Sequence, residues 1–140
     1  MKVVLDTSVI VSGLRSNRGA SNRVLQMAYA KTFQTLATPA LFLEYEEVLG
    51  RDEHREVHGL SSEKLSDFLI GLADIIEPVR VYYQWRPQLP DTDDEMVLES
   101  AINGRADLIV THNVKDFIVA TAKFNVRVIS PASLVSEMLK

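Results

Sequence analysis

Short apolar segments alternate along the chain with stretches of helical spacing. The first apolar segment covers residues 3–5, ends at Asp6 and is followed by a second β-branched run over 7–11. Such a run, without polar alternation, is typical of a strand buried on both faces of a parallel sheet. Similar patterns predict the remaining strands over 33–37, 79–83, 107–111 and 126–129.

Helical periodicity fills the intervals between these strands. Thr38 is a favourable N-cap before Pro39, and Gly104 is a favourable stop for a helix that begins near Asp93. Strands that alternate with helices predict an α/β fold with a mostly parallel central sheet and right-handed crossovers. Other helices are predicted over 19–31, from Ser61 or Ser62 to about Pro78, over 116–122 and over 131–140, with a charged break over 51–59.

Composition narrows the class of protein. The chain has 140 residues, 46% of them hydrophobic, and no internal repeat or linker, so a single globular domain over 1–140 is expected. The absence of cysteine excludes a disulfide scaffold, a thiolate nucleophile and an iron–sulfur cluster. A net charge of -4 argues against a basic nucleic-acid-binding protein. Asp6 interrupts any N-terminal signal segment, and the other apolar runs are short, which favours a cytoplasmic protein without a membrane span.

Polar residues follow two of the predicted strands. Asp6 follows the first, and Thr111 to Asn113 follow the strand near Leu108. Ligands of open parallel sheets bind beyond the carboxyl ends of the strands, so these positions are candidates for a functional site. Asp6 has an equally plausible structural role as a helix cap or turn residue.

Asp94 is the acid whose position most needs an explanation. At about 100° per residue, Val97, Leu98 and Ala101 surround Asp94 on the helix, whereas Asp93 and Glu95 fall about 100° to either side. A carboxylate on a buried face is costly unless it is paired, hydrogen-bonded or bound to a metal. The neighbouring acids have a simpler explanation, because carboxylates favour the first turn of a helix.

Two further positions add acids to this set. Glu44 and Glu46 flank the apolar stripe of the helix after Pro39 equally, so geometry does not choose between them. Asp116 lies just beyond a strand end. Converging carboxylates repel one another, and a divalent cation is the usual compensation. All-oxygen ligands favour Mg²⁺ or Mn²⁺, which can promote phosphodiester hydrolysis.

With these motifs in place, the sequence resembles the PIN domain family of small metal-dependent ribonucleases over nearly its whole length. The resemblance implies a three-layer α/β/α fold. The sequence around the acidic residues is most similar to that of PIN-family toxins of bacterial and archaeal toxin–antitoxin pairs. The motifs that carry it are Leu5-Asp6-Thr7-Ser8-Val9, Leu43-Glu44-Tyr45-Glu46-Glu47-Val48-Leu49, Asp94 with Leu98, Glu99 and Ala101, and Ile109-Val110-Thr111-His112-Asn113-Val114-Lys115-Asp116-Phe117.

The resemblance implies a role for each matching residue. It selects Glu44 over Glu46 and makes Asp6, Glu44, Asp94 and Asp116 the catalytic, metal-binding acids. Asn113 stands where some members have Asp, and it would ligate through its carbonyl oxygen or hold a water. The hydroxyls that would orient the carboxylates are those of Thr7, Ser8 and Thr111. The nearest candidates for contacts to RNA phosphates are Arg15, Arg18 and Arg23.

The implied activity is a Mg²⁺- or Mn²⁺-dependent endoribonuclease that leaves a 5′-phosphate and a 3′-hydroxyl. The implied partners are an RNA substrate, a cognate antitoxin and a second copy of the chain, as a homodimer or a higher homo-oligomer. Asn113 motivates an alternative, a PIN-like domain that has lost catalysis and binds nucleic acid or protein. A nuclease acting on DNA is a third possibility.

Other chemical motifs are set aside. His54 and His58 have the i, i+4 spacing of a metal pair, but Arg55 stands where a zincin has Glu, so an exposed loop or frayed helix end is expected. His112 is expected to line the rim of the site. Trp85 is expected at the edge of the core or on a dimer surface, in preference to stacking on a nucleic-acid base. The absence of GxGxxG and GxxxxGK[ST] motifs argues against nucleotide cofactors.

Overall fold

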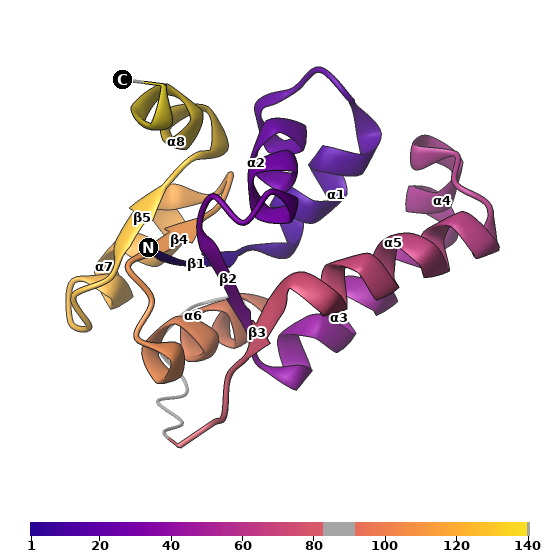
Figure 1. The fold of residues 1–140 in the computed structure, drawn as a ribbon. Helices are drawn as coiled ribbons and strands as arrows, with labels where there is room; N and C mark the ends of the chain where they lie inside the picture. Colours follow the sequence, from indigo (N-terminus) through magenta and orange to yellow (C-terminus); the bar gives the residue numbers. More distant parts are fainter. Residues whose placement is uncertain (83–91, 140) are drawn as a thin grey trace.

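The computed structural model describes residues 1–82 and 92–139 of the chain. Figure 1 shows a central sheet with helices packed around it. The strands are β1 (Lys2–Leu5), β2 (Gln34–Ala37), β3 (Ile76–Pro78), β4 (Leu108–Val110) and β5 (Arg127–Ile129). The helices are α1 (Thr7–Arg15), α2 (Ala20–Tyr29), α3 (Pro39–Leu49), α4 (Asp52–His58), α5 (Ser62–Ile75), α6 (Thr92–Gly104), α7 (Val114–Thr121) and α8 (Pro131–Met138).

The described strands form one sheet in the order β3-β2-β1-β4-β5, and every neighbouring pair is parallel. The chain proceeds outward from β1 to β2 and β3, then returns to place β4 on the other side of β1. The strand order therefore reverses between β1 and β4. In open α/β sheets, the crevice beyond the carboxyl ends of two such strands is the usual place for a ligand.

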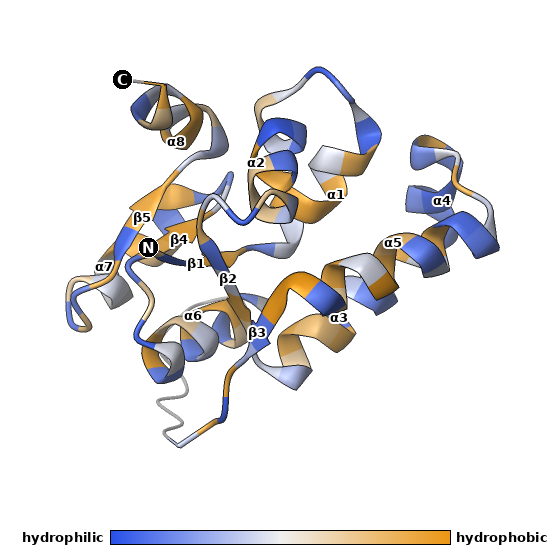
Figure 2. Ribbon diagram, viewed as in Figure 1, coloured by the Kyte–Doolittle hydropathy of each residue, from blue (hydrophilic) through white to orange (hydrophobic). Residues whose placement is uncertain are grey.

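Helices cover both faces of this sheet. Figure 1 shows α1, α2 and α8 on one side of it and α6 and α7 on the other. The residues of β4 and residues 3–5 of β1 are buried on both faces, and Figure 2 shows the hydrophobic colouring of these two strands. The predicted three-layer α/β/α architecture is confirmed, and the sheet is parallel throughout its described strands.

Three predicted elements were wrong. Residues 7–11 begin helix α1 instead of extending a strand, because the fold buries Val9 and Ile10 on one helix face. The charged segment over 51–59 contains helix α4, although none of its residues is buried. The strand predicted over 79–83 is absent from its described residues, 79–82. The observed strand is β3, which begins as soon as α5 ends and includes Pro78. As an edge strand, β3 accommodates a proline.

Gly104 allows α6 to approach the sheet closely. A Cβ atom at this position would lie 2.8 Å from Leu36 Cδ1 and 2.9 Å from Val79 Cγ2, both in buried side chains. We expect Gly104→Ala to lower the free energy of unfolding by about 1–3 kcal/mol through overpacking, measured by urea denaturation. Gly71→Ala is the control, because its Cβ would make only ordinary contacts with Tyr29 and alanine favours a helix. Equal stability changes at the two glycines would contradict the close approach.

Candidate functional site

Asp6 directly follows β1 and occupies the N-cap position of α1, but its side chain does not cap the helix. Instead, Asp6 Oδ2 accepts hydrogen bonds from Ser8 Oγ at 2.9 Å and from Thr111 Oγ1 at 2.6 Å. The residue is 5% exposed, and Oδ1 has no hydrogen-bond partner among the described residues. Oδ1 is not among the fully buried atoms that lack a partner, so it keeps contact with solvent and is accessible to a cation. The geometry therefore favours a ligand-binding role for Asp6 over the capping role that the sequence left open.

Thr111 joins the two strands at which the strand order reverses. It follows β4, is fully buried, and donates to Asp6 while its Oγ1 accepts from the backbone N–H of Asn113 at 3.0 Å. This pair of hydrogen bonds fixes both the Asp6 carboxylate and the turn that leads to α7. Two of the three predicted orienting hydroxyls, those of Ser8 and Thr111, thus contact Asp6. Thr7 lies in the first turn of α1 and makes no side-chain hydrogen bond with the described residues.

Asn113 and Asp116 lie at the start of α7. The Asp116 backbone N–H donates to the Asn113 carbonyl at 3.0 Å, which forms the first turn of the helix. Both side chains are exposed, and neither makes a hydrogen bond or ion pair with the described part of the chain. The structure therefore brings them to the same edge of the sheet as Asp6 without joining them to its carboxylate.

Helix α3 is anchored to β1 directly beside Asp6. The fully buried Tyr45 hydroxyl donates to the Leu5 carbonyl at 2.5 Å. Burial raises the pKa of Tyr45 above its ordinary value, and the nearby Asp6 carboxylate raises the pKa further. Glu44 precedes Tyr45 and is half-buried, whereas Glu46 is exposed. The structure thus separates the two acids that the helical pattern left equal, and Glu44 is the one nearer the interior.

The sequence motif around Glu44 includes Tyr45, but the contact of the Tyr45 hydroxyl with the strand end was not predicted. A tyrosine in a position that is otherwise hydrophobic was the available signal, because a buried phenol needs a hydrogen-bond partner.

Helix α6 is positioned through a buried serine. Ser100 Oγ lies 3.1 Å from both the Thr38 backbone nitrogen and Thr38 Oγ1, where β2 gives way to α3. This contact holds α6 against the carboxyl end of β2. Asp94 precedes Ser100 in the same helix and lies near the helix start. Sequence reasoning did not single out Ser100. Its only signal was a small polar residue next to the buried position of Ala101.

Asp94 is buried, with 9% of its surface exposed, as the helical pattern predicted. The prediction that the neighbouring Glu95 needs no explanation was wrong, because Glu95 is also buried, as is Glu99 further along the helix. All three acids have interaction partners. Helix α6 therefore carries three buried carboxylates, more than the apolar stripe alone indicates.

These acids do not form a ready-made metal centre. In residues 1–82 and 92–139, no group of three or more His, Asp or Glu side chains has an arrangement that could hold a metal ion. The chemistry of the donors nevertheless fits a hard divalent cation, because carboxylate oxygens are its preferred ligands. Asp6, with one oxygen held by two hydroxyls and the other unpaired, is the residue best prepared for such an ion.

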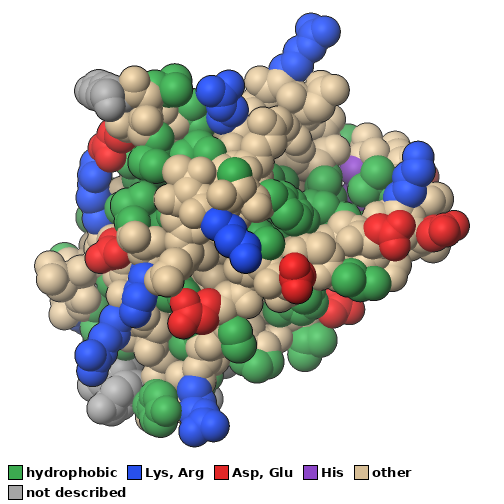
Figure 3. All heavy atoms as spheres, in the orientation of Figure 1, with side chains coloured by type: hydrophobic (Ala, Val, Ile, Leu, Met, Phe, Trp, Pro, Cys, Tyr) green, Lys and Arg blue, Asp and Glu red, His purple; other side chains and the backbone are tan. Residues whose placement is uncertain are grey.

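The candidate RNA-contacting arginines are dispersed. Arg15 lies within hydrogen-bond distance of His54 Nδ1 in α4, at 3.1 Å. Arg18 and Arg23 instead line a hollow of about 380 Å³ at the start of α2. Figure 3 likewise shows Lys and Arg side chains at separate places on the drawn face instead of in one basic patch. A further polar contact at the site's edge, missed from the sequence, joins the exposed His112 to the buried Ser21 at 2.7 Å.

The structure also accounts for the histidine pair that was set aside. His54 and His58 lie in helix α4, and each has a protein partner: Arg15 for His54, and the Leu49 carbonyl with the Leu60 N–H for His58. Trp85 lies outside the described residues. Among the described helices, none is long and apolar enough to cross a membrane.

The chain is an α/β protein with a parallel sheet and a buried carboxylate where the strand order reverses, which is the place where such sheets usually bind a ligand. A family model described as the PIN domain matches residues 2–115, and the chain therefore belongs to the PIN domain family. PIN domains are generally nucleases that use divalent metal ions. A comparison with curated proteins gives no match.

Proposed function

We propose that this chain is a Mg²⁺- or Mn²⁺-dependent endoribonuclease whose acids lie at the carboxyl edge of the sheet. The observation that carries the proposal is the state of Asp6, a buried N-cap residue that does not cap its helix and keeps one oxygen unpaired. The family membership supports the nuclease class. Asp6, Glu44, Asp94 and Asp116 are the proposed metal-binding acids, with Asn113 as a neutral oxygen donor.

The residues have distinct proposed tasks. Ser8 and Thr111 hold Asp6 Oδ2, so that Oδ1 keeps a fixed direction toward an ion. Tyr45 and Ser100 fix the helices that present Glu44 and Asp94. When bound, the ion lowers the pKa of a water molecule and stabilises the charge that develops on the phosphate. Arg18 and Arg23 bind RNA phosphates away from the scissile bond.

The metal requirement is the direct test of this proposal. We expect a chelator to reduce cleavage of RNA by about a thousandfold, and added Mn²⁺ or Mg²⁺ to restore the cleavage, because the ion contributes several kcal/mol to the transition state. A DNA oligonucleotide of the same sequence, assayed in parallel, decides between the RNA and DNA proposals. Cleavage that persists in chelator, or that is equal in an Asp94→Asn variant, would contradict the proposed metal site.

Thr111 gives a second test, because its hydroxyl holds Asp6. We expect Thr111→Val to reduce the rate of RNA cleavage by about 10–100-fold, the usual effect of removing a group that orients a metal ligand. Thr121→Val is the matched control. Thr121 is also buried, but among the described residues its hydroxyl contacts only carbonyl groups of its own helix. Equal activity of the two variants would show that Thr111 does not position the site.

We further propose that the chain is a single cytoplasmic domain that acts as the toxin of a type II toxin–antitoxin pair and forms a homodimer. Exposed apolar residues on the two middle helices, Leu43 on α3 and Ile70 on α5, support a dimer. A short neighbouring reading frame that encodes a DNA-binding segment and a tail, and whose product blocks RNA cleavage, would support the toxin assignment. Light scattering of the purified chain measures the oligomeric state.

A second candidate function is a catalytically inactive PIN domain that binds nucleic acid or protein. It is favoured by Asn113 and by the absence of a three-residue metal group among the described side chains. Calorimetric titration with Mn²⁺ separates the two candidates. Binding that Asp6→Asn removes supports the nuclease, whereas no binding supports the inactive domain.

A further inference from the structure

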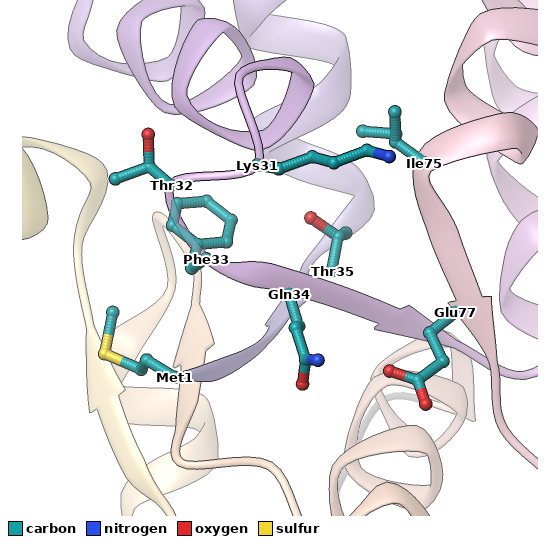
Figure 4. Close-up of a pocket in the computed structure, with 8 residues that line it drawn as sticks. All are labelled: Met1, Lys31, Thr32, Phe33, Gln34, Thr35, Ile75 and Glu77. Carbon is teal, nitrogen blue, oxygen red and sulfur yellow. The ribbon is translucent and has the colours of Figure 1, made fainter.

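The two ends of the sheet differ in how their polar side chains are arranged. At the amino ends of the strands, a hollow of about 460 Å³ has Lys31 on one side of β2 and Glu77 on the other, as Figure 4 shows, so these charges do not meet on one ligand. At the carboxyl end, the exposed His112 directly follows Thr111, the residue that holds Asp6. His112 is therefore a polar side chain beside the candidate site that the proposed nuclease does not yet use.

A buried serine holds the exposed His112 side chain in place. Ser21 is 3% exposed and lies in the first turn of α2, and its Oγ is 2.7 Å from His112 Nε2. An exposed side chain is normally free to change rotamer, whereas this one is tied to a residue 91 positions away in the sequence. The contact therefore gives the imidazole ring a defined orientation at the edge of the site.

The same contact determines which ring nitrogen carries the proton. Among the described residues, His112 Nε2 is the only partner of the Ser21 hydroxyl, and a buried hydroxyl whose proton lacks an acceptor destabilises the fold. The hydroxyl therefore donates to Nε2, which places the proton of the neutral ring on Nδ1. Nδ1 has no partner in the described part of the chain, so the exposed residue offers a free N–H group.

The surroundings of His112 favour a phosphate as the acceptor for this N–H group. On one side, the preceding residue holds Asp6, the proposed ligand of the ion. On the other, Ser21 belongs to the start of α2, where Arg18 and Arg23 line a hollow of about 380 Å³ and form no ion pair with the described residues. An RNA backbone that runs from the ion to these arginines would pass His112, and every nucleotide of that backbone offers phosphate oxygens regardless of its base.

We propose that His112 binds the substrate by donating from Nδ1 to a phosphate oxygen next to the scissile bond, and that Ser21 positions the ring for this contact. The inference rests on the proposed ribonuclease function and deepens it, because it assigns two residues to the RNA backbone. Neither residue is a proposed metal ligand, so their loss affects the binding of RNA more than the chemical step.

Two substitutions of His112 separate the roles of its ring nitrogens. His112→Asn keeps an N–H donor near the position of Nδ1, whereas His112→Gln keeps a polar group near that of Nε2. We expect His112→Ala and His112→Gln to raise KM for RNA about tenfold with little change in kcat, and His112→Asn to raise it less than about threefold. His58→Ala is the control and should leave KM unchanged, because His58 lies in α4 and bonds to Leu49 and Leu60. An unchanged KM in His112→Ala, or equal KM values for His112→Asn and His112→Gln, would overturn the contact from Nδ1.

Ser21→Ala tests whether the serine acts through the histidine. We expect this substitution to raise KM about threefold in the unsubstituted chain and to have no further effect in His112→Ala, since the two side chains form one unit. An equal effect in both backgrounds would mean that Ser21 is only structural and would overturn its assignment as the positioning residue.

The affinity for RNA in chelator, measured by fluorescence anisotropy with oligo(A), oligo(C) and oligo(U), gives a readout that does not depend on cleavage. A phosphate contact predicts the same loss in His112→Ala for all three sequences, and a loss confined to one of them would overturn the phosphate contact in favour of a base. If the unsubstituted chain binds RNA but does not cleave it with metal, the nuclease proposal fails and a loss in His112→Ala still supports the contact. If the chain cleaves RNA and His112→Ala keeps full affinity, the contact alone fails.

Discussion

Asp6→Asn is expected to reduce metal-dependent RNA cleavage by about a thousandfold or more while the fold persists. The substitution keeps an oxygen that can accept from Ser8 and Thr111 but removes the negative charge that would bind the ion. Loss of a metal ligand removes several kcal/mol of transition-state stabilisation, which corresponds to a rate factor of this size. The measurement is the initial rate of RNA cleavage in saturating Mn²⁺, with circular dichroism to show that the helices remain.

Thermal unfolding gives the same variant a readout that does not depend on catalysis. A ligand that binds only the folded chain raises its unfolding temperature. We therefore expect Mn²⁺ to stabilise the unsubstituted chain but not Asp6→Asn. Without metal, Asp6→Asn should be at least as stable as the unsubstituted chain, because it no longer buries a charge that lacks a counter-ion.

Asp107→Asn is the matched control for both measurements. Asp107 lies at the amino end of the same pair of strands, where its Oδ2 accepts from the Lys2 backbone N–H at 2.8 Å. This variant should retain cleavage and stabilisation by Mn²⁺. Similar losses in Asp107→Asn and Asp6→Asn would show that the effect arises from the sheet and not from a metal ligand.

The sequence was sufficient to predict a mostly parallel sheet with helices between most of its strands, because each buried strand leaves a continuous apolar run. It was insufficient at residues 7–11, where β-branched side chains favour a strand locally and burial of Val9 and Ile10 imposes a helix. Propensity is a weak guide wherever tertiary packing selects one face of an element. Helix α4 was not predicted from the sequence, because none of its charged residues is buried and they show no apolar stripe.

For the site, helical geometry identified Asp94 as a buried acid, and the strand pattern placed Asp6 and Thr111 at one edge. The hydrogen bond between Asp6 and Thr111 joins residues 105 positions apart and depends on the pairing of β1 with β4, which no local pattern specifies. The contacts of Tyr45 and Ser100 have the same origin, since each links elements that only the tertiary fold brings together. Sequence reasoning therefore identifies candidate acids more readily than the residues that hold them in place.

Tyr45→Phe should produce the second large effect, because it removes the hydroxyl that joins α3 to the end of β1. Loss of a hydrogen bond to a buried carbonyl is expected to lower the free energy of unfolding by about 1–3 kcal/mol. The Leu5 carbonyl immediately precedes Asp6, and Glu44 precedes Tyr45, so looser packing of α3 also displaces two proposed metal ligands. A displacement of about 1 Å can cost a hundredfold in rate, and we expect a loss of about 10–100-fold in RNA cleavage.

Tyr29→Phe is the control, since the partly exposed Tyr29 hydroxyl donates to the Phe68 carbonyl at 3.2 Å, away from the site. Urea denaturation should show a smaller loss of stability for Tyr29→Phe, and RNA cleavage should be unchanged.

The change in folding stability at alkaline pH gives a separate test of the buried Tyr45 phenol. Because the pKa of Tyr45 is raised in the folded state, its protonated phenol favours folding below the unfolded-state pKa of about 10, and this contribution is lost as the pH rises further. Tyr45→Phe should therefore lose less stability above pH 10 than the unsubstituted chain, and an equal loss would contradict the buried position of the phenol.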